Sequence, residues 1–283
     1  MLIPIIAAIA LASITVLEKI VLRKKKIKIE AFQLLTFLSA VIVMLPLLYF
    51  FWKFEPEALQ MKNILILSLV IITAVLANIS TFYALKWEKV SNIEPALIME
   101  PLFIVMLALI FSFFTTGLYE RNFTVIIPAL IAGFALILSH VKKHHLSFNK
   151  YFLAAILGAL LYAIELVISV LILDFYSPIS FYFFRSAGIL VLTFLIFRPK
   201  IKNSTQLKTY KTIFLIGALW VLYRVSVYYG FLQLGVIFTT LIIMLGPVFV
   251  YLFAKIFLHE KLSWRNILAA IIIVICVLYV TLF

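Results

Sequence analysis

Six charged residues inside long apolar stretches of the sequence are candidates for chemistry. They are Glu18, Glu94, Glu100, Glu165, Arg185 and Arg224. A charge near the centre of a bilayer costs about 2.5 to 3.5 kcal/mol, so it persists where it faces a cavity or an oppositely charged partner. A carboxylate in such a place can bind a proton, and a guanidinium group can hold a carboxylate or phosphate through two hydrogen bonds. The residue types therefore favour binding and movement of small solutes or protons.

Glu100 is the first candidate for this chemistry. It lies about 10 Å along the predicted span Ile93–Phe114, at 1.5 Å per residue. Pro101 follows it and removes a backbone donor, which opens the helix locally. A carboxylate there can bind a proton and exchange it for substrate. The alternative is a structural ion pair with Arg185 or Arg224 that only orients the helices.

Glu165 and Glu18 lie at similar depths of two other predicted spans. As a pair, they are expected to line a solute pathway from either side of the membrane. For Glu18 an alternative stays open, because it is close to a basic loop and can extend to the membrane surface beside Lys19. Glu94 precedes Pro95 near the start of its span and is expected to cap that helix.

The two arginines lie too deep in their spans to reach the membrane surface easily. Arg185 and Arg224 can each hold a carboxylate or phosphate of the substrate. They can equally be counter-ions of the intramembrane glutamates, and both alternatives stay open. Asn78 and Tyr228 are expected to join Arg224 in the substrate pathway, where aromatic rings stack planar or cationic solutes. Packing or lipid contact is the alternative for any single ring, including Trp220, Tyr223 and Tyr229.

The composition requires a membrane protein around these residues. Of 283 residues, 66% are hydrophobic and 12% are charged, and the mean hydropathy is +1.23, whereas soluble domains contain about 25% charged residues. A helix that crosses the bilayer needs about 20 apolar residues. The predicted fold is all-α, with ten transmembrane helices at 2–22, 30–52, 62–86, 93–114, 123–139, 151–173, 177–197, 211–233, 236–258 and 264–283. A count of nine spans stays open, because two of the connections are very short.

The basic residues predict how the chain crosses the membrane. The net charge is +13, but most Lys and Arg stand in short runs between apolar stretches, which argues against nucleic-acid binding. The loops after spans 1, 3, 5, 7 and 9 hold 17 Lys and Arg, and the opposite loops hold Lys53, Lys62 and Arg121. The positive-inside rule therefore places the first set in the cytoplasm and both termini outside, for a multi-pass protein of the cell membrane.

An internal repeat divides the chain into residues 1–146 and 147–283. A shift of 147 residues lays Glu18 on Glu165, and a shift of 146 lays Pro101 on Pro247. Both prolines are expected to break their helices. Each predicted half has five helices, an odd number, so the second half must cross the membrane in the opposite sense. Two inverted repeats around a midplane site are typical of transporters that work by alternating access.

At these residues the chain resembles the ten-helix EamA-like branch of the drug/metabolite transporter superfamily. The second half reads Gly246-Pro247-Val248-Phe249 and then Leu258-His259-Glu260-Lys261, and the first reads Glu100-Pro101-Leu102-Phe103 and then Leu118-Tyr119-Glu120-Arg121. The Pro and Arg that this family carries in the second helix of a half appear as Pro178 and Arg185. The resemblance implies two five-helix EamA-like repeats and a transporter of small organic solutes.

The function predicted is a secondary transporter that moves a small organic metabolite across the cell membrane, with protons as one candidate coupling ion. The alternatives are an intramembrane enzyme that modifies lipids with the buried Glu and Arg residues, and a receptor or assembly factor. No nucleotide-binding or hydrolase motif occurs, and the single cysteine, Cys276, allows no intramolecular disulfide and no cysteine-based metal site. The partners expected are the lipid bilayer and a small-molecule substrate, with no nucleic acid, metal or cofactor.

Overall fold

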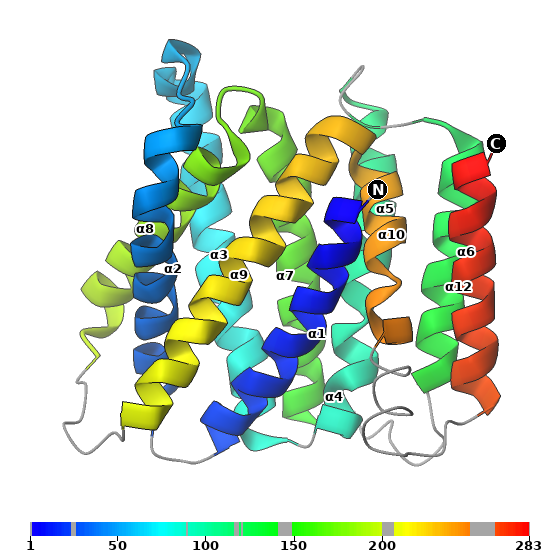
Figure 1. Cartoon of the computed structure of the whole chain (residues 1–283), viewed down its shortest axis with the longest axis horizontal. Coiled ribbons are helices and arrows are strands. Elements are labelled where there is room, and N and C mark those ends of the chain that lie inside the picture. The colour runs from blue at the N-terminus through cyan, green and yellow to red at the C-terminus, as the bar shows by residue number, and fades with distance from the viewer. Residues whose placement is uncertain are drawn as a thin grey trace.

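The computed structural model shows a bundle of α-helices that stand side by side (Figure 1). It describes residues 2–23, 27–88, 90–115, 119, 121–140, 149–199, 207–249 and 264–282. The elements are α1 (Leu2–Arg23), α2 (Ile29–Phe51), the 3₁₀ turn η1 (Pro56–Leu59), α3 (Met61–Trp87), α4 (Val90–Leu97), α5 (Met99–Ser112), α6 (Phe123–His140), α7 (Lys150–Leu173), α8 (Pro178–Phe197), α9 (Leu207–Leu234), α10 (Val236–Ile243) and α12 (Trp264–Leu282).

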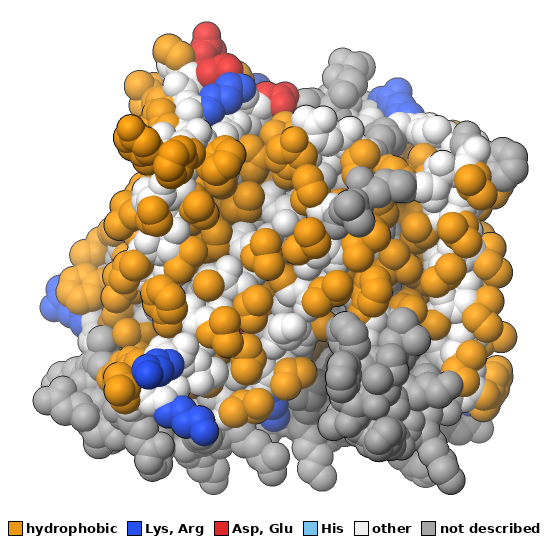
Figure 2. Space-filling view, viewed as in Figure 1, with side chains coloured by type: hydrophobic (Ala, Val, Ile, Leu, Met, Phe, Trp, Pro, Cys, Tyr) orange, Lys and Arg blue, Asp and Glu red, His pale blue; other side chains and the backbone are white. Residues whose placement is uncertain are grey.

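The helices have the length and composition of membrane spans. Within the described residues, eight are long and apolar enough to cross a bilayer, and two shorter apolar segments lie at Phe123–Ser139 and Val236–Phe249. Hydrophobic side chains cover the middle of the face seen in Figure 2, and the acidic and basic side chains visible there lie toward its two ends. The predicted all-α membrane fold is confirmed.

The fourth predicted span is two helices instead of one. Helix α4 ends at Leu97 and α10 ends at Ile243, each four residues before a proline. A proline at position i has no N–H for the carbonyl of residue i−4, so the helical hydrogen-bond ladder stops there. The structure thus places a break next to Pro101 and another next to Pro247. Helix α4 is described from Val90, so Glu94 lies inside it and not at its start as predicted, and the side chain of Glu94 lies outside the described part of the structure.

Helices from the two ends of the sequence pack against each other. Helix α1 packs on α9, α3 on α7, α2 on both α8 and α9, and α6 on α12. Helices α2 and α8 are antiparallel, because Gln33 Nε2 donates to Thr193 Oγ1 at 2.8 Å and the Lys53 N–H donates to Ser180 Oγ at 3.1 Å. The main hydrophobic core therefore forms between residues of the first and second halves of the chain.

Small residues allow the closest of these helix contacts. An added Cβ at Gly217 of α9 would lie 2.6 Å from Ser39 Cβ and 2.9 Å from the carbonyl oxygen of Thr36, both on α2. Backbone atoms on the partner helix cannot move aside as a flexible side chain can. Close approach through small residues is a general feature of helix packing in membranes.

We predict that Gly217→Ala separates α9 from α2 and destabilises the protein by about 1–3 kcal/mol, as overpacking does. The measurement is the thermal unfolding midpoint of the purified protein in detergent. Gly133→Ala is the matched control, because its Cβ would meet mainly the end of the Leu102 side chain, at 3.0 Å. Alanine is also the better helix former, so the control should unfold near the wild-type temperature. Equal midpoints for the two variants would contradict the close contact.

Candidate functional site

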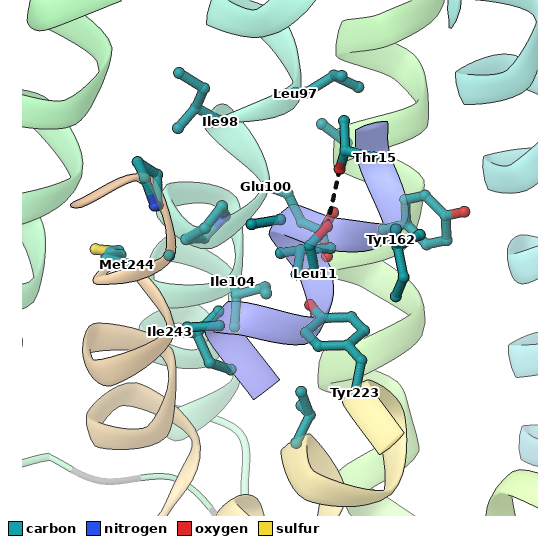
Figure 3. Close-up of a pocket in the computed structure, with 18 of the residues that line it drawn as sticks. Leu11, Thr15, Leu97, Ile98, Glu100, Ile104, Tyr162, Tyr223, Ile243 and Met244 are labelled. Atoms are coloured by element: carbon teal, nitrogen blue, oxygen red, sulfur yellow. Dashed lines mark hydrogen bonds between the residues drawn. The ribbon is translucent and has the colours of Figure 1, made fainter. Parts of the chain in front are cut away.

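A cavity of about 290 Å³ lies between helices of both halves of the chain (Figure 3). Its lining residues come from α1, α3, α4, α5, α6, α7, α9 and α10 and from the segment after α10. Most of the wall is apolar. The polar and aromatic lining residues are Thr15, Glu18, Thr81, Glu100, Tyr162, Trp220, Tyr223, Phe231 and Thr240. A largely apolar cavity with a few polar groups is the usual form of a small-molecule site.

Next to the cavity, one buried glutamate holds two buried arginines. Glu165 on α7 accepts a hydrogen bond from Arg185 Nε at 2.6 Å and one from the Tyr228 hydroxyl at 3.0 Å. Arg224 Nη1 lies 3.4 Å from the other carboxylate oxygen, Oε2. All four side chains are buried. This cluster ties α7, α8 and α9 together, and none of its members lines the cavity.

Arg224 is separated from the cavity by aromatic rings. Its guanidinium carbon lies 5.2 Å from the ring centroid of Tyr162 and 5.4 Å from those of Trp220 and Tyr223. All three rings line the cavity. None of the guanidinium nitrogens of Arg224 has a hydrogen-bond acceptor within the described part of the chain. The charge of Arg224 is therefore balanced by the Glu165 carboxylate and by the ring faces.

Glu100 reaches the cavity from the first turn of α5. Figure 3 shows its side chain among the other lining residues. Among the described residues, no side chain forms an ion pair or a hydrogen bond with its carboxylate. The predicted alternative, an ion pair of Glu100 with Arg185 or Arg224, is therefore wrong, because Glu165 holds both arginines.

Glu18 also faces the cavity, from α1. Its side chain is 3% exposed, and it accepts a hydrogen bond from Trp220 Nε1 at 2.8 Å. The neighbouring Lys19 turns away and donates to the carbonyl oxygens of Leu85, at 2.7 Å, and Glu88. The interpretation that Glu18 extends to the membrane surface beside Lys19 is wrong. A tryptophan on α9 instead holds the Glu18 carboxylate inside the bundle.

Asn78 and Tyr228 position other residues of the site. Asn78 Oδ1 accepts from the Tyr162 hydroxyl at 2.8 Å, and its amide donates to the Ala74 carbonyl at 2.6 Å. Neither Asn78 nor Tyr228 lines the cavity. Sequence reasoning missed Tyr162, although its spacing of three residues from Glu165 places both on one helix face. Tyr229, by contrast, is 44% exposed and lies on the outer surface.

The described residues contain no group of three or more His, Cys, Asp or Glu side chains that could hold a metal ion. Cys276 is a buried free thiol. The loop residues at 141–148 and the segment 250–263, which contains the predicted motif at 258–261, lie outside the described residues.

Comparison with known proteins finds a family that is similar to part of this chain. Residues 149–282, the second half of the chain, match the EamA-like transporter family. A solved structure titled "Crystal structure of protein" is 16% identical, with a TM-score of 0.67, over 98% of this chain and 97% of its own. That similarity shows a shared fold over both halves. No curated protein matches the chain.

The EamA-like half supplies the whole ion cluster. Glu165, Arg185, Arg224 and Tyr228 all lie within the matched residues. Arg185 is the eighth residue of α8, which begins with Pro178. The first half supplies the two carboxylates that face the cavity, Glu18 and Glu100. The site thus requires both halves, and its charged groups are divided unequally between them.

We predict that Glu165→Gln destabilises the protein by about 3–5 kcal/mol, because it leaves two buried arginines without a carboxylate. Tyr228→Phe is the matched control. It removes one hydrogen bond to the same carboxylate and should cost about 1 kcal/mol. The thermal unfolding midpoints of the two purified variants test the difference. A Glu165→Gln variant that unfolds no earlier than Tyr228→Phe would show that the glutamate does not balance the arginines.

Proposed function

We propose that the chain is a secondary transporter that carries a small organic solute across the cell membrane by alternating access. The observation that carries this proposal is the cavity between the two halves, into which the unpaired carboxylate of Glu100 projects. A half-buried acid without a partner inside the membrane is costly unless a solute or proton occupies the same space. The match of the second half to a transporter family is the second support.

The packing of the helices supports two inverted repeats, residues 1–146 and 147–283. Exchange of the halves turns the α1–α9 pair into α7–α3, and both pairs pack closely. The same exchange converts α2 into α8 and α6 into α12, so the α2–α8 and α6–α12 pairs stay the same pairs. Because α2 and α8 are antiparallel, a two-fold axis that relates them lies perpendicular to the helices, in the membrane plane. This is the symmetry of transporters whose halves exchange conformations to open the site to either side.

The two broken helices lie at the site in this arrangement. The α4–α5 break and the end of α10 both contribute to the cavity lining, through Ile98 and Met244 among others. Discontinuous helices at a repeat interface are a recurrent feature of transporter binding sites. Glu100 follows the first break by two residues, so movement at the break would move the carboxylate. We therefore assign proton exchange for solute to Glu100.

An intramembrane lipid-modifying enzyme is less well supported. Such an enzyme needs an acid, a base and a phosphate-binding group that meet at one reaction site. Both arginines are occupied by Glu165 and lie outside the cavity lining. The acids that face the cavity, Glu18 and Glu100, have no cation within hydrogen-bond distance among the described residues.

We predict that Glu100→Gln, in proteoliposomes, retains exchange of a labelled solute at saturating concentration but loses its acceleration by a pH gradient. The reason is that an amide keeps the shape of the side chain and cannot carry the proton. The solute is chosen by a thermal-shift screen of amino acids, nucleosides, sugars and organic amines, since ligands that bind the folded state raise its stability. Glu57→Gln, at an exposed position on η1, is the control. Unchanged pH dependence in Glu100→Gln would contradict proton coupling through this residue.

We propose further that the side with more Lys and Arg is cytoplasmic, and a labelling experiment on intact cells tests this. In a Cys276→Ala background, the only cysteine is the one introduced. Lys62→Cys and Lys208→Cys both replace exposed residues at opposite ends of the bundle. A membrane-impermeant maleimide should label Cys at 62 in intact cells and Cys at 208 only after lysis. The reverse pattern would invert the proposed orientation.

A further inference from the structure

Among the described residues that line the cavity, two carry a carboxyl group and none carries a basic group. Glu18 and Glu100 line the cavity, whereas neither Arg185 nor Arg224 does. We propose that the cavity binds an organic cation with a single positive charge, and that this class of compound is the transported solute. The second part rests on the proposed transport function. The first part rests on the charges and contacts of the cavity alone.

A count of the charges in and beside the cavity supports a single positive charge on the ligand. Among the described residues there are three carboxylates, Glu18, Glu100 and Glu165, and two guanidinium groups, Arg185 and Arg224. With all five ionised, as after release of the proton assigned to Glu100, one negative charge remains uncompensated. Such a charge is strongly unfavourable in a water-poor interior unless a proton or a cation neutralises it. A bound monocation removes that excess, whereas an anion doubles it and a neutral molecule leaves it unchanged.

The unbonded nitrogens of Arg224 do not make the cavity an anion site. The rings of Tyr162, Trp220 and Tyr223 lie over the guanidinium group and form the adjacent cavity wall. Arg224 Nη1 already lies 3.4 Å from Glu165 Oε2. A carboxylate or phosphate in the cavity would meet these ring faces and two like charges before it reached the arginine.

A hydroxyl group in the wall adds a hydrogen-bond acceptor for an ammonium group. The hydroxyl of Thr15 donates to the Leu11 carbonyl at 3.1 Å, so its oxygen lone pairs are available to a donor in the cavity. Thr81 also lines the cavity, but its Oγ1 is enclosed and packs against Gly158 of α7, where an added Cβ would lie 2.3 Å from it. An ammonium group has three donors and no acceptor, which suits acceptor-only partners.

The rest of the wall selects the body of the ligand. Leu11, Ile104 and Phe231 are among the aliphatic and aromatic side chains that surround the polar groups. Such a wall favours an apolar or aromatic body, since burial of apolar surface away from water is favourable. The expected ligand is therefore a small primary amine that carries a hydrocarbon or aryl group.

Three probes of similar shape and different charge test this proposal. They are 2-phenylethylamine, 2-phenylethanol and 3-phenylpropionate, and each is titrated into the purified full-length protein with calorimetry and thermal shift. We expect saturable binding of the amine and at least tenfold weaker binding of the alcohol and the carboxylate. Equal binding of all three probes, a preference for 3-phenylpropionate, or no binding of the amine would overturn the proposal.

Two acid-to-amide variants and their combination extend the test. Glu18→Gln and Glu100→Gln each bring the charge count to zero and should weaken amine binding at least tenfold, while Glu57→Gln should not change it. Gln at position 18 can still accept from Trp220, so the fold is expected to survive, and unfolding midpoints without probe check this. The double variant carries one excess positive charge and should prefer 3-phenylpropionate to the amine. Wild-type amine affinity in the double variant would overturn the charge argument.

Uptake into proteoliposomes separates this inference from the transport function. Binding and uptake of 2-phenylethylamine support both proposals. Binding without uptake supports the cation site and contradicts the transporter. Uptake of 2-phenylethanol or 3-phenylpropionate without uptake of the amine contradicts the cation class, and leaves the transporter supported.

Discussion

The pairing of two buried arginines with one glutamate is the interaction on which the site depends. A bilayer supplies no water to charged groups, so every buried charge must find its partner inside the protein. Glu165 satisfies Arg185 directly and lies within ion-pair distance of Arg224. Once this carboxylate holds both cations, no described cation is left within pairing distance of Glu100 or Glu18. Both acids line the cavity beside this cluster.

The same cluster explains why the aromatic residues gather where they do. A guanidinium group held by one carboxylate still presents two flat faces and several edges to its surroundings. Tyr162, Trp220 and Tyr223 cover Arg224 with ring faces, which interact favourably with a cation. Two of these residues also donate hydrogen bonds away from Arg224, Trp220 to Glu18 and Tyr162 to Asn78. The rings therefore connect the cluster in the second half to α1 and α3 in the first.

The sequence allowed the architecture to be predicted better than the site. Long apolar runs must become helices in lipid, so most helix bounds fall within a few residues of the predicted ones, and Pro101 and Pro247 marked the places where the helices break. The partners of the charged residues depend on packing between helices far apart in sequence. Nothing local to Glu18 indicates that Trp220, 202 positions away, donates to its carboxylate. The short distance in sequence between Glu18 and a basic loop instead suggested that the side chain extends to the membrane surface, which is wrong. Glu100 was recognised as a candidate because its depth in the span and the adjacent proline can be read from the local sequence. Its lack of an arginine partner depends on long-range packing and cannot be read in this way.

The unequal chemistry of the two halves of the chain follows from a few positions of the proposed internal repeat. Glu18 and Glu165 are equivalent under the 147-residue shift, yet one is paired with arginines and the other is not. The same shift places Leu38 opposite Arg185, and the 146-residue shift places Asn78 opposite Arg224. The first half thus has an acid at the position of Glu165 but neither of the two bases. Glu100 corresponds to Gly246, so the second half lacks the cavity acid that the first half has. This asymmetry confines the carboxylates that face the cavity to the first half. In the proposed alternating access, one set of charged residues serves both openings, because the two halves share a single cavity that both of them line.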